Sequence, residues 1–266
     1  MRVPAVPPAA GRRALLPMVL LAVPLLLTGC GSESTPSGPT PSGSTAGADA
    51  ADPRSQIAGF AALAQDRGLT AFYTLTVPGQ PDRTVGVTRA TDRSWRVDIP
   101  GGALGGTIDI SIAQNADGIY QCALPSDMNH VDPVCVRVGE PGSTLPTRID
   151  PRVQHAFADW QEVLTDRQAP LSVSTAEAPL GLEGSCFSVE STSASIAPAL
   201  EPGIYCYDGS GTPTGAKLDF GTLALSGPPA AGPPTISLPA PVVDREPLEV
   251  GGPAAPSDAP STRTVG

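Results

Sequence analysis

Two stretches of the chain show a helical period, with apolar residues recurring three and four positions apart. Each stretch opens with the tripeptide Asp-Pro-Arg, at 52–54 and at 150–152. Aspartate at the N-cap accepts hydrogen bonds from backbone amides that have no partner within the helix, and proline at the first helical position has no amide proton to leave unsatisfied. We therefore predict two amphipathic helices, one beginning at each tripeptide. Their apolar stripes comprise Ile57, Phe60, Ala61 and Ala64 in the first and Val153, Ala156, Phe157, Trp160 and Leu164 in the second.

Elsewhere the hydrophobic period is two, as in half-buried β-strands. The clearest alternation runs over 107–114, where Ile108, Ile110 and Ile112 share one face. Short strands joined by tight turns favour an antiparallel sheet, and about ten of them in one sheet tend to curl. We predict an α+β fold in which a curled antiparallel sheet is covered on its concave face by the two helices. The other expected strands cover 69–77, 84–89, 94–99, 119–124, 134–138, 171–176, 186–191, 203–207, 217–220 and 222–225.

The N-terminus has the three parts of a bacterial lipoprotein signal: arginines within the first thirteen residues, an apolar stretch at 14–27, and small residues before Cys30. The apolar stretch is short and contains two prolines, which favours a cleaved signal over a membrane-spanning helix. We predict a signal peptide at 1–29 and lipid, including palmitate, on Cys30. The chain would then be anchored at the extracytoplasmic face of the cell membrane. An ordinary secretory signal with an accidental cysteine is the alternative.

Composition divides the rest of the chain into three parts. Residues 30–51 hold the lipidated cysteine and a tether of Gly, Ser, Thr, Pro and Ala, which has too little apolar bulk to fold. Residues 52–243 have the length of a single domain with one core, and 235–239 would form its last edge strand. Residues 244–266 are expected to be a disordered tail.

The chain is acidic, with a net charge of −10 that becomes −13 once a signal peptide with three arginines and no acid is removed. Nucleic-acid binding needs clustered positive charge, so we do not expect a nucleic-acid partner. Lys217 is the only lysine, and Ala, Gly and Pro are abundant. This composition indicates a GC-rich, actinobacterial genome.

Four cysteines are left once Cys30 carries lipid, and an even number in an exported chain indicates disulfides. Three pairings are possible. The pairing of neighbours, Cys122 with Cys135 and Cys186 with Cys206, is favoured because each pair brackets a hairpin or adjacent strands. A zinc site is the competing interpretation, but the spacings are wide and no C-x-x-C occurs, so no metal is expected.

No catalytic motif stands out in the sequence. His130 and His155 lie in no recognisable motif, no G-x-S-x-G is present, and both histidines are expected to be exposed to solvent. Residues 208–211 form a hairpin turn and lack the acids of a calcium loop. We therefore expect no enzyme activity and no cofactor. An envelope enzyme that depends on one of the histidines is the less favoured alternative.

Apolar side chains on the strands and the second helix have two interpretations, because a cavity wall and a filled core show the same period. Core packing is favoured for each residue taken singly. The candidate ligand-cavity residues are Phe72, Trp95, Ile108, Ile110, Ile112, Phe157 and Trp160.

The order of these features, from the lipid signal through the tether, helix, paired cysteines and mid-chain helix to a final Leu-Pro-Ala-Pro, resembles a known family. The most specific segments are the pair Cys186-Phe187 and the run Gly-Ile-Tyr-Cys-Tyr-Asp-Gly at 203–209. Residues 52–243 resemble the LolA-like lipoproteins of actinobacteria, which include lipid-transfer lipoproteins of the LppX/LprG type. The resemblance implies a half-barrel closed by helices, which binds a lipid or lipid conjugate in a hydrophobic cavity for transport or retention. The alternative is a non-enzymatic sensor or protein-interaction lipoprotein of the same fold with a filled core.

Overall fold

The computed structural model describes residues 52–127, 129–193 and 198–252. The expected signal peptide, the lipidation site Cys30, the tether up to residue 51 and the last residues, 253–266, lie outside the described residues. Within the described ranges, no helix combines the length and the apolar character that a membrane crossing requires.

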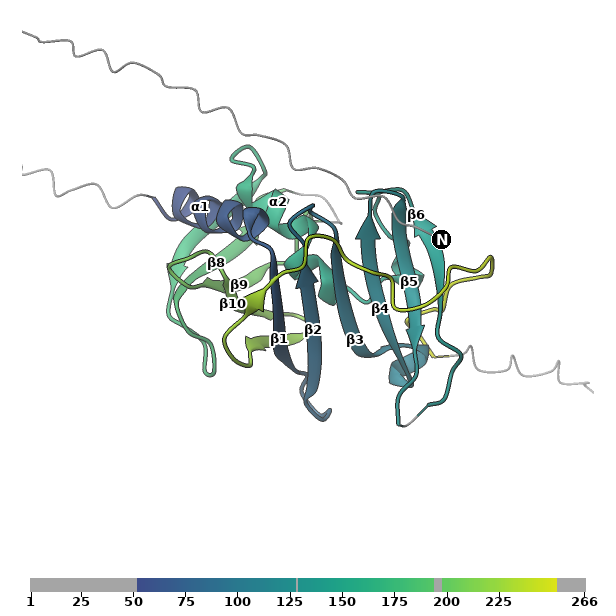
Figure 1. The fold of residues 1–266 in the computed structure, drawn as a ribbon. Coiled ribbons are helices and arrows are strands. Elements are labelled where there is room, and N and C mark those ends of the chain that lie inside the picture. The colour runs from purple at the N-terminus through teal and green to yellow at the C-terminus, as the bar shows by residue number, and fades with distance from the viewer. Residues whose placement is uncertain (1–51, 128, 194–197, 253–266) are drawn as a thin grey trace, which may run out of the picture. The chain divides into compact units, whose positions relative to one another are not determined.

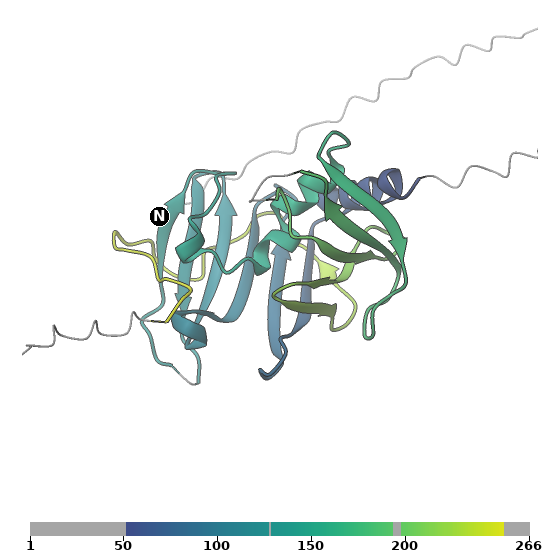
Figure 2. The ribbon, with the colours of Figure 1, turned by 180° about the vertical axis from the view of Figure 1, so that it is seen from behind.

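The described residues form one open sheet of 12 antiparallel strands (Figures 1 and 2), so the mostly-sheet α+β prediction is confirmed. The strand order is β6-β5-β4-β3-β2-β1-β11-β10-β9-β8-β7, with β12 also paired to β1. Two antiparallel meanders, β1 to β6 and β7 to β11, are therefore joined where β1 pairs with β11. The strands are β1 (Leu69–Thr76), β2 (Arg83–Arg89), β3 (Trp95–Ala103), β4 (Ile108–Asn115), β5 (Gly118–Leu124), β6 (Val134–Gly139), β7 (Leu171–Ala176), β8 (Ser185–Ser191), β9 (Gly203–Tyr207), β10 (Pro213–Leu218), β11 (Gly221–Leu225) and β12 (Ala230–Ala231).

The first predicted helix is present as α1 (Pro53–Asp66). Its N-cap is Asp52, whose Oδ1 accepts a hydrogen bond from the Ser55 amide at 3.0 Å, and proline occupies the first turn as the sequence predicts. Ile57 and Ala61 on its inner face are completely buried. The hydrophobic period and the cap together account for this helix.

The second helix is shorter than the sequence predicts. A 3₁₀ turn, η3 (Val153–Phe157), precedes α2 (Asp159–Thr165), and the chain breaks between them at Ala158, with φ −120° and ψ −111°. Arg152, at φ 68°, turns the chain just before η3. The apolar residues of the predicted stripe are nevertheless buried, because η3 and α2 present them to the sheet in turn. Two further 3₁₀ turns are η1 (Leu104–Gly106) and η2 (Thr147–Ile149).

Both helical segments cover the same face of the sheet (Figure 1). The ring of Phe60 in α1 lies 5.8 Å from that of Tyr207 in β9 and 6.1 Å from that of Phe187 in β8, measured between centroids. Phe157 in η3 lies 4.5 Å from Tyr73 in β1. The main core fills the space between the helices and both meanders. Its completely or nearly completely buried side chains include Tyr73, Tyr207, Phe187, Ile57, Leu75, Ile99, Ile110, Ile112, Leu164, Leu200 and Leu223.

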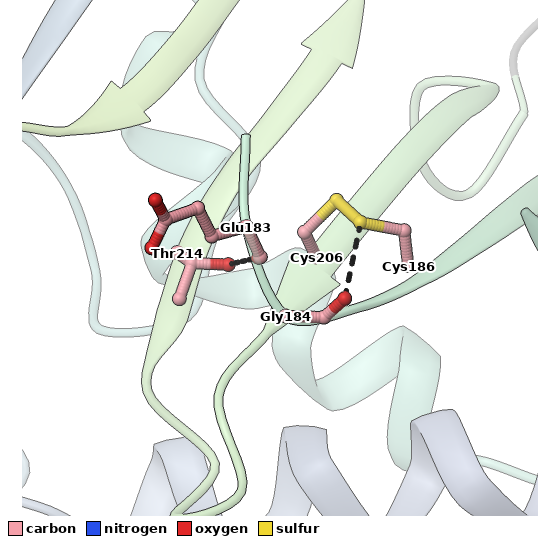
Figure 3. The surroundings of a disulfide bond; sticks show 5 residues. All are labelled: Glu183, Gly184, Cys186, Cys206 and Thr214. Carbon is pink, nitrogen blue, oxygen red and sulfur yellow. Dashed lines mark hydrogen bonds between the residues drawn. A yellow bond between two sulfur atoms is a disulfide. The ribbon is translucent and has the colours of Figure 1, made fainter. Parts of the chain in front are cut away.

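Two disulfides join directly opposed residues of neighbouring strands, and both predicted pairs are confirmed. Cys122 in β5 bonds to Cys135 in β6, and Cys186 in β8 bonds to Cys206 in β9. Figure 3 shows the second bond beside the turn before β8, where the Cys186 sulfur contacts the Gly184 carbonyl at 3.9 Å. Each bond closes a short loop and contributes about 3 kcal/mol by the chain-entropy argument. One disulfide therefore reinforces each meander.

The residues after β12 run along the sheet as a C-terminal strap, residues 233–252. Its carbonyl groups at Pro233 and Glu249 accept hydrogen bonds from Thr91 and Leu104 at 3.0 Å and 2.8 Å. Val242 forms a parallel bridge with Cys135, so the strap pairs with β6 at the edge of the sheet. The expected edge strand at 235–239 is not a regular strand. A disordered tail is expected from residue 244. Residues 244–252 instead belong to the strap and are hydrogen-bonded to the rest of the domain.

Candidate functional site

A cleft of about 290 Å³ opens at one end of the helix-covered face. It lies between the C-terminal end of α1, strands β2 to β5, the loop at 142–145, and the segment formed by η3 and the start of α2. We call it the His155 cleft; its wall includes Gln65, Arg89, Trp95, Gln154, His155 and Glu162. Two further cavities, which border Phe157 on the aromatic face of the sheet, hold about 10 Å³ each.

His155 is held between two carboxylates. Its Nδ1 lies 2.6 Å from Asp159 Oδ1, its Nε2 lies 3.0 Å from Asp150 Oδ2, and its side chain is 14 % exposed. Burial by itself lowers the pKa of the imidazole, but the hydrogen bonds to Asp150 and Asp159 outweigh it and raise the pKa to about 9. The ring is therefore protonated at neutral pH, and both ring nitrogens donate. The expectation that His155 is exposed was wrong, because the carboxylates on either side draw the ring inward, whereas His130 is exposed as expected.

The two aspartates differ in their setting. Asp150 has a side chain that is 14 % exposed, and Asp159 one that is 56 % exposed. Burial tends to raise the pKa of Asp150, but the hydrogen bond and charge of His155 reverse this and hold the pKa below its usual value. Asp150 is thus a largely buried carboxylate that is kept ionised by its partners.

Gln154 is the most buried polar residue of the cleft wall, at 1 % exposure. Its Nε2 donates to Asp150 Oδ1 at 2.7 Å, whereas its Oε1 has no hydrogen-bond partner. Reversing the amide would give His155 Nε2, 3.2 Å away, an acceptor but would bring Oε1 against the Asp150 carboxylate, so the shorter contact with Asp150 favours the orientation described. An acceptor buried without a partner costs about 1–3 kcal/mol. Gln154 Oε1 has almost no accessible surface, so this unpaired acceptor is enclosed within the wall of the cleft.

Arg89 supplies a fixed positive charge from β2. Its guanidinium donates to the carbonyls of Gln65, at 3.3 Å, and Phe157, at 2.9 Å, and the residue is 9 % exposed. Burial lowers the pKa of Arg89, and Glu162 on α2 opposes that shift. The same arginine thus links β2, α1 and η3 and faces an acid across the cleft. The charged residues of the wall are Arg89, Arg93 and His155 on the positive side and Asp66, Asp159 and Glu162 on the negative side.

The two tryptophans occupy different positions. Trp95 begins β3 and is partly exposed in the cleft wall. Trp160 is buried behind the imidazole, with its ring centroid 5.3 Å from that of His155 and nearly parallel to it. The face of Trp160 stabilises the protonated ring through a cation–π contact. Trp95 presents an aromatic surface to whatever enters the cleft.

The structure does not gather the seven candidate cavity residues around one cavity. Ile108, Ile110, Ile112, Phe157 and Trp160 are buried in the main core. Trp95 instead lines the His155 cleft, and Phe72 is 57 % exposed on the opposite face of β1.

Of the residues that line this cleft, sequence reasoning named only Trp95 as a ligand-cavity residue. Asp159 lies four positions after His155 and Asp150 five positions before it, and the first of these spacings is a local signal for a carboxylate contact. Gln154 and Arg89 carry no such signal, since their roles depend on segments distant in sequence.

The arrangement provides hydrogen-bond donors, acceptors and an aromatic surface. Both nitrogens of His155 are engaged with carboxylates, which leaves no lone pair for accepting a proton at neutral pH. Among the described residues, no group of three or more His, Cys, Asp and Glu side chains is arranged to hold a metal ion.

Comparison with known proteins adds no relative: no protein-family model matches the chain, and no curated protein matches it.

Proposed function

We propose that the protein is an envelope lipoprotein whose folded domain is a non-enzymatic binding module, with a filled core and the His155 cleft as its binding site. The observation that carries this proposal is the difference between two parts of the helix-covered face. Its aromatic part is closely packed around cavities of about 10 Å³, while the 290 Å³ cleft has a largely polar wall. Such a module senses or captures a ligand and does not need to enclose it.

The first expectation, a lipid carrier of the LolA-like type, has less support. The open antiparallel sheet with helices on one face agrees with a half-barrel of that kind. Acyl chains, however, need several hundred Å³ of apolar space. Phe60, Phe157 and Trp160 occupy that face, so lipid would enter only if α1 and α2 moved away from the sheet.

Native mass spectrometry distinguishes the two functions. The chain is exported behind a general secretory signal as the Cys30→Ala variant, which is not lipidated. A filled core gives the mass of the protein with two disulfides and no lipid. A bound mass that extracts into organic solvent would overturn the filled core and favour the carrier.

A blocking variant tests the cleft itself. Thr144 is exposed and lines the cleft, whereas Thr147 is exposed nearby in η2 and does not. Thr144→Trp should abolish capture of small molecules from an envelope extract, measured by mass spectrometry of what the protein retains, and Thr147→Trp should not. Equal capture by both variants would place binding elsewhere.

We further propose that Cys30 anchors the protein at the extracytoplasmic face of the cell membrane. The order of charged, apolar and small residues before it supports this. In the native host, Cys30→Ala should move the protein from the membrane fraction to the soluble fraction. Retention in the membrane would contradict the anchor.

A further inference from the structure

The two edges of the sheet differ in whether another segment covers them. At β6 the strap takes up the outward-facing backbone: the Cys135 amide donates to the Pro241 carbonyl, and the Cys135 carbonyl accepts from the Val243 amide, each at 2.8 Å. At β7 no described residue outside β8 is hydrogen-bonded to the backbone of 172–176. Folded proteins normally cover, bend or charge such edges, because an exposed edge pairs readily with another strand. Within the described part of the chain, β7 is therefore the open edge.

The disulfide next to β7 shows which of its backbone groups face outward. The Cα atoms of Cys186 and Cys206 are 4.1 Å apart, as in antiparallel pairs that share no backbone hydrogen bond. Cys186 then directs its amide and carbonyl to its other side, toward Ala176 of β7. The other disulfide supports this argument, because Cys135 lies 3.9 Å from Cys122 between Cα atoms and bonds to the strap on its far side.

The direction of hydrogen bonding alternates from one residue of a strand to the next. Counted back from Ala176, every second residue of β7 is bonded to β8. The residues between them, Leu171, Val173 and Thr175, direct their carbonyls to the open side. Val173 and Thr175 direct their amides there as well, whereas the Leu171 amide is bonded to the Ala169 carbonyl at 2.7 Å. The open edge thus presents three acceptors and two donors.

Nothing in the sequence of β7 prevents a further strand from pairing with it. The strand contains neither a charged residue nor a proline, and it pairs with β8 over all six residues without a register shift. Leu171 and Val173 are only partly buried where they pack against the main core on the helix-covered face. A further strand would cover these two side chains and satisfy the free backbone groups together.

We propose that the β7 edge pairs antiparallel with the β7 edge of a second copy of this chain. The edge is complementary to itself. With Val173 opposite Val173 of the other copy, the two residues exchange two hydrogen bonds, and each Thr175 amide reaches the free Leu171 carbonyl across the pair. No charged side chain lies on the paired strands, so the acidic net charge of the protein is not concentrated at the contact.

The symmetry of the pair agrees with the position of α1. The two-fold axis is perpendicular to the sheet, so both copies keep their helices on the same face. α1 begins beside the segment that leads into β7, since Arg54 donates to the Asp166 carbonyl. The N-terminal ends of both α1 helices therefore lie on one face of the paired sheets. This arrangement is compatible with the anchoring proposed above, although the pairing itself rests neither on the anchor nor on the His155 cleft.

The size of the contact sets the expected strength. One pair of six-residue strands is small compared with a standard interface of about 1,600 Å². We therefore expect a weak dimer, with a dissociation constant between about 10 μM and 1 mM. Attachment of both copies to one membrane would raise their effective concentration and favour pairing.

Two double variants test the register. It places Ser172 of one copy opposite Ser174 of the other, twice by symmetry, and both side chains are exposed. Ser172→Lys with Ser174→Lys opposes like charges, whereas Ser172→Lys with Ser174→Glu opposes unlike charges. In analytical ultracentrifugation of the exported Cys30→Ala chain, the second variant should dimerise about tenfold more tightly than the first. Net charge alone predicts the reverse order, because two lysines make the acidic protein less acidic.

A blocking variant tests the open amides. Thr175→Pro removes an amide that faces outward and leaves the bonds between β7 and β8 in place, since proline is tolerated at such edge positions. It should abolish dimerisation up to about 1 mM. Thr175→Val keeps the amide and is the matched control, which should dimerise as the unmodified chain does. Circular dichroism establishes that each variant is folded, and the two charge variants keep the proposal testable if Thr175→Pro is not.

Each remaining outcome overturns the pairing. An unmodified chain that is monomeric at about 1 mM would exclude it. A dimer that Thr175→Pro leaves intact, or charge variants of equal affinity, would place the contact elsewhere. Photo-crosslinking in the host from benzoylphenylalanine at position 174 that yields another protein and no self-adduct would assign the edge to a different partner. The His155 cleft is unaffected by any of these results and stands or falls with Thr144→Trp.

Discussion

The two Asp-Pro-Arg tripeptides are identical in sequence and have different roles. At 52–54 the aspartate caps α1 through the Ser55 amide. At 150–152 no regular α-helix begins, and the Asp150 carboxylate accepts hydrogen bonds from the side chains of Gln154 and His155. The same local signal thus starts a helix in one place and positions two residues of the wall of the His155 cleft in the other.

The difference lies in the residues on the C-terminal side of each tripeptide. After Asp52 the carboxylate accepts a hydrogen bond from the backbone amide of Ser55. Asp150 also accepts a backbone hydrogen bond, from the Arg152 amide at 2.9 Å, but it accepts from the Gln154 and His155 side chains as well, and Arg152, at φ 68°, turns the chain out of the helical path. Side-chain hydrogen bonds compete with helical ones for the same groups. A capping contact therefore starts a helix only where the next residues also keep helical dihedral angles, as they do after Asp52 but not at Arg152.

Among the changes that test the difference between the two tripeptides, removing Asp150 should lower the free energy of unfolding the most. Asp150→Ala leaves His155 with Asp159 as its remaining carboxylate partner and removes the acceptor of the Gln154 amide. Removing one partner of a largely buried charge pair costs about 3–5 kcal/mol. We expect a loss of about 3 kcal/mol in the free energy of unfolding, measured by urea denaturation. Arg245→Ala, at an exposed position of the strap that does not line the cleft, is the control and should unfold as the unmodified protein does. A loss no larger than that control's would contradict the clamped histidine.

Raising the pH should also lower the free energy of unfolding, by somewhat less than removing Asp150, because it removes the positive charge of His155. The pKa of His155 rises from 6.5 to about 9 on folding, so its stabilisation is complete below pH 6.5 and is lost as the pH rises through 9. We expect the free energy of unfolding to fall by about 2–3 kcal/mol between about pH 6.5 and pH 9.5. His155→Gln should flatten this dependence. A profile in the unmodified protein that is already flat would contradict the raised pKa.

Removing Asp52 should have a smaller effect than removing Asp150. Asp52→Ala withdraws one exposed cap from an otherwise intact helix, while Ile57 and Ala61 stay packed. We expect a modest decrease in stability and faster amide exchange confined to the first turn of α1, measured by hydrogen exchange. Asp52→Asn keeps a capping oxygen and should restore both. A loss as large as that of Asp150→Ala would mean that the two tripeptides are equivalent after all.

The smallest expected difference is in the helicity of isolated peptides that contain each tripeptide. Peptides covering 52–67 and 150–165 contain the tripeptide without the tertiary contacts. Both should show similar, weak helicity by circular dichroism, because short helices are marginal in water. If 150–165 is clearly the less helical, the break at Ala158 has a local cause and not a tertiary one.

Sequence patterns predicted the features that depend on neighbours along the chain. The alternation at 107–114 corresponds to β4 (Ile108–Asn115), and the cysteine spacing gave both disulfides. Residues 244–252 were predicted to be part of a disordered tail because their hydrogen bonds are made to backbone groups of other segments, such as Leu104 and Arg148. The cleft was missed for a related reason: Arg89, Trp95 and Gln154 meet only after the meanders and the helical segment are packed together.

The pairing of β1 with β11 has a consequence for the time the protein takes to fold. Tyr73 lies opposite Leu225, so the strand at the centre of the sheet gains its second neighbour only when nearly the whole domain has been synthesised. Contacts so distant in sequence make folding slow, since the loop between them must be closed before they form. Until then one edge of β1 stays open to any strand that reaches it first. Shielding of that edge by a chaperone should therefore matter more for the yield of this protein than for its final stability.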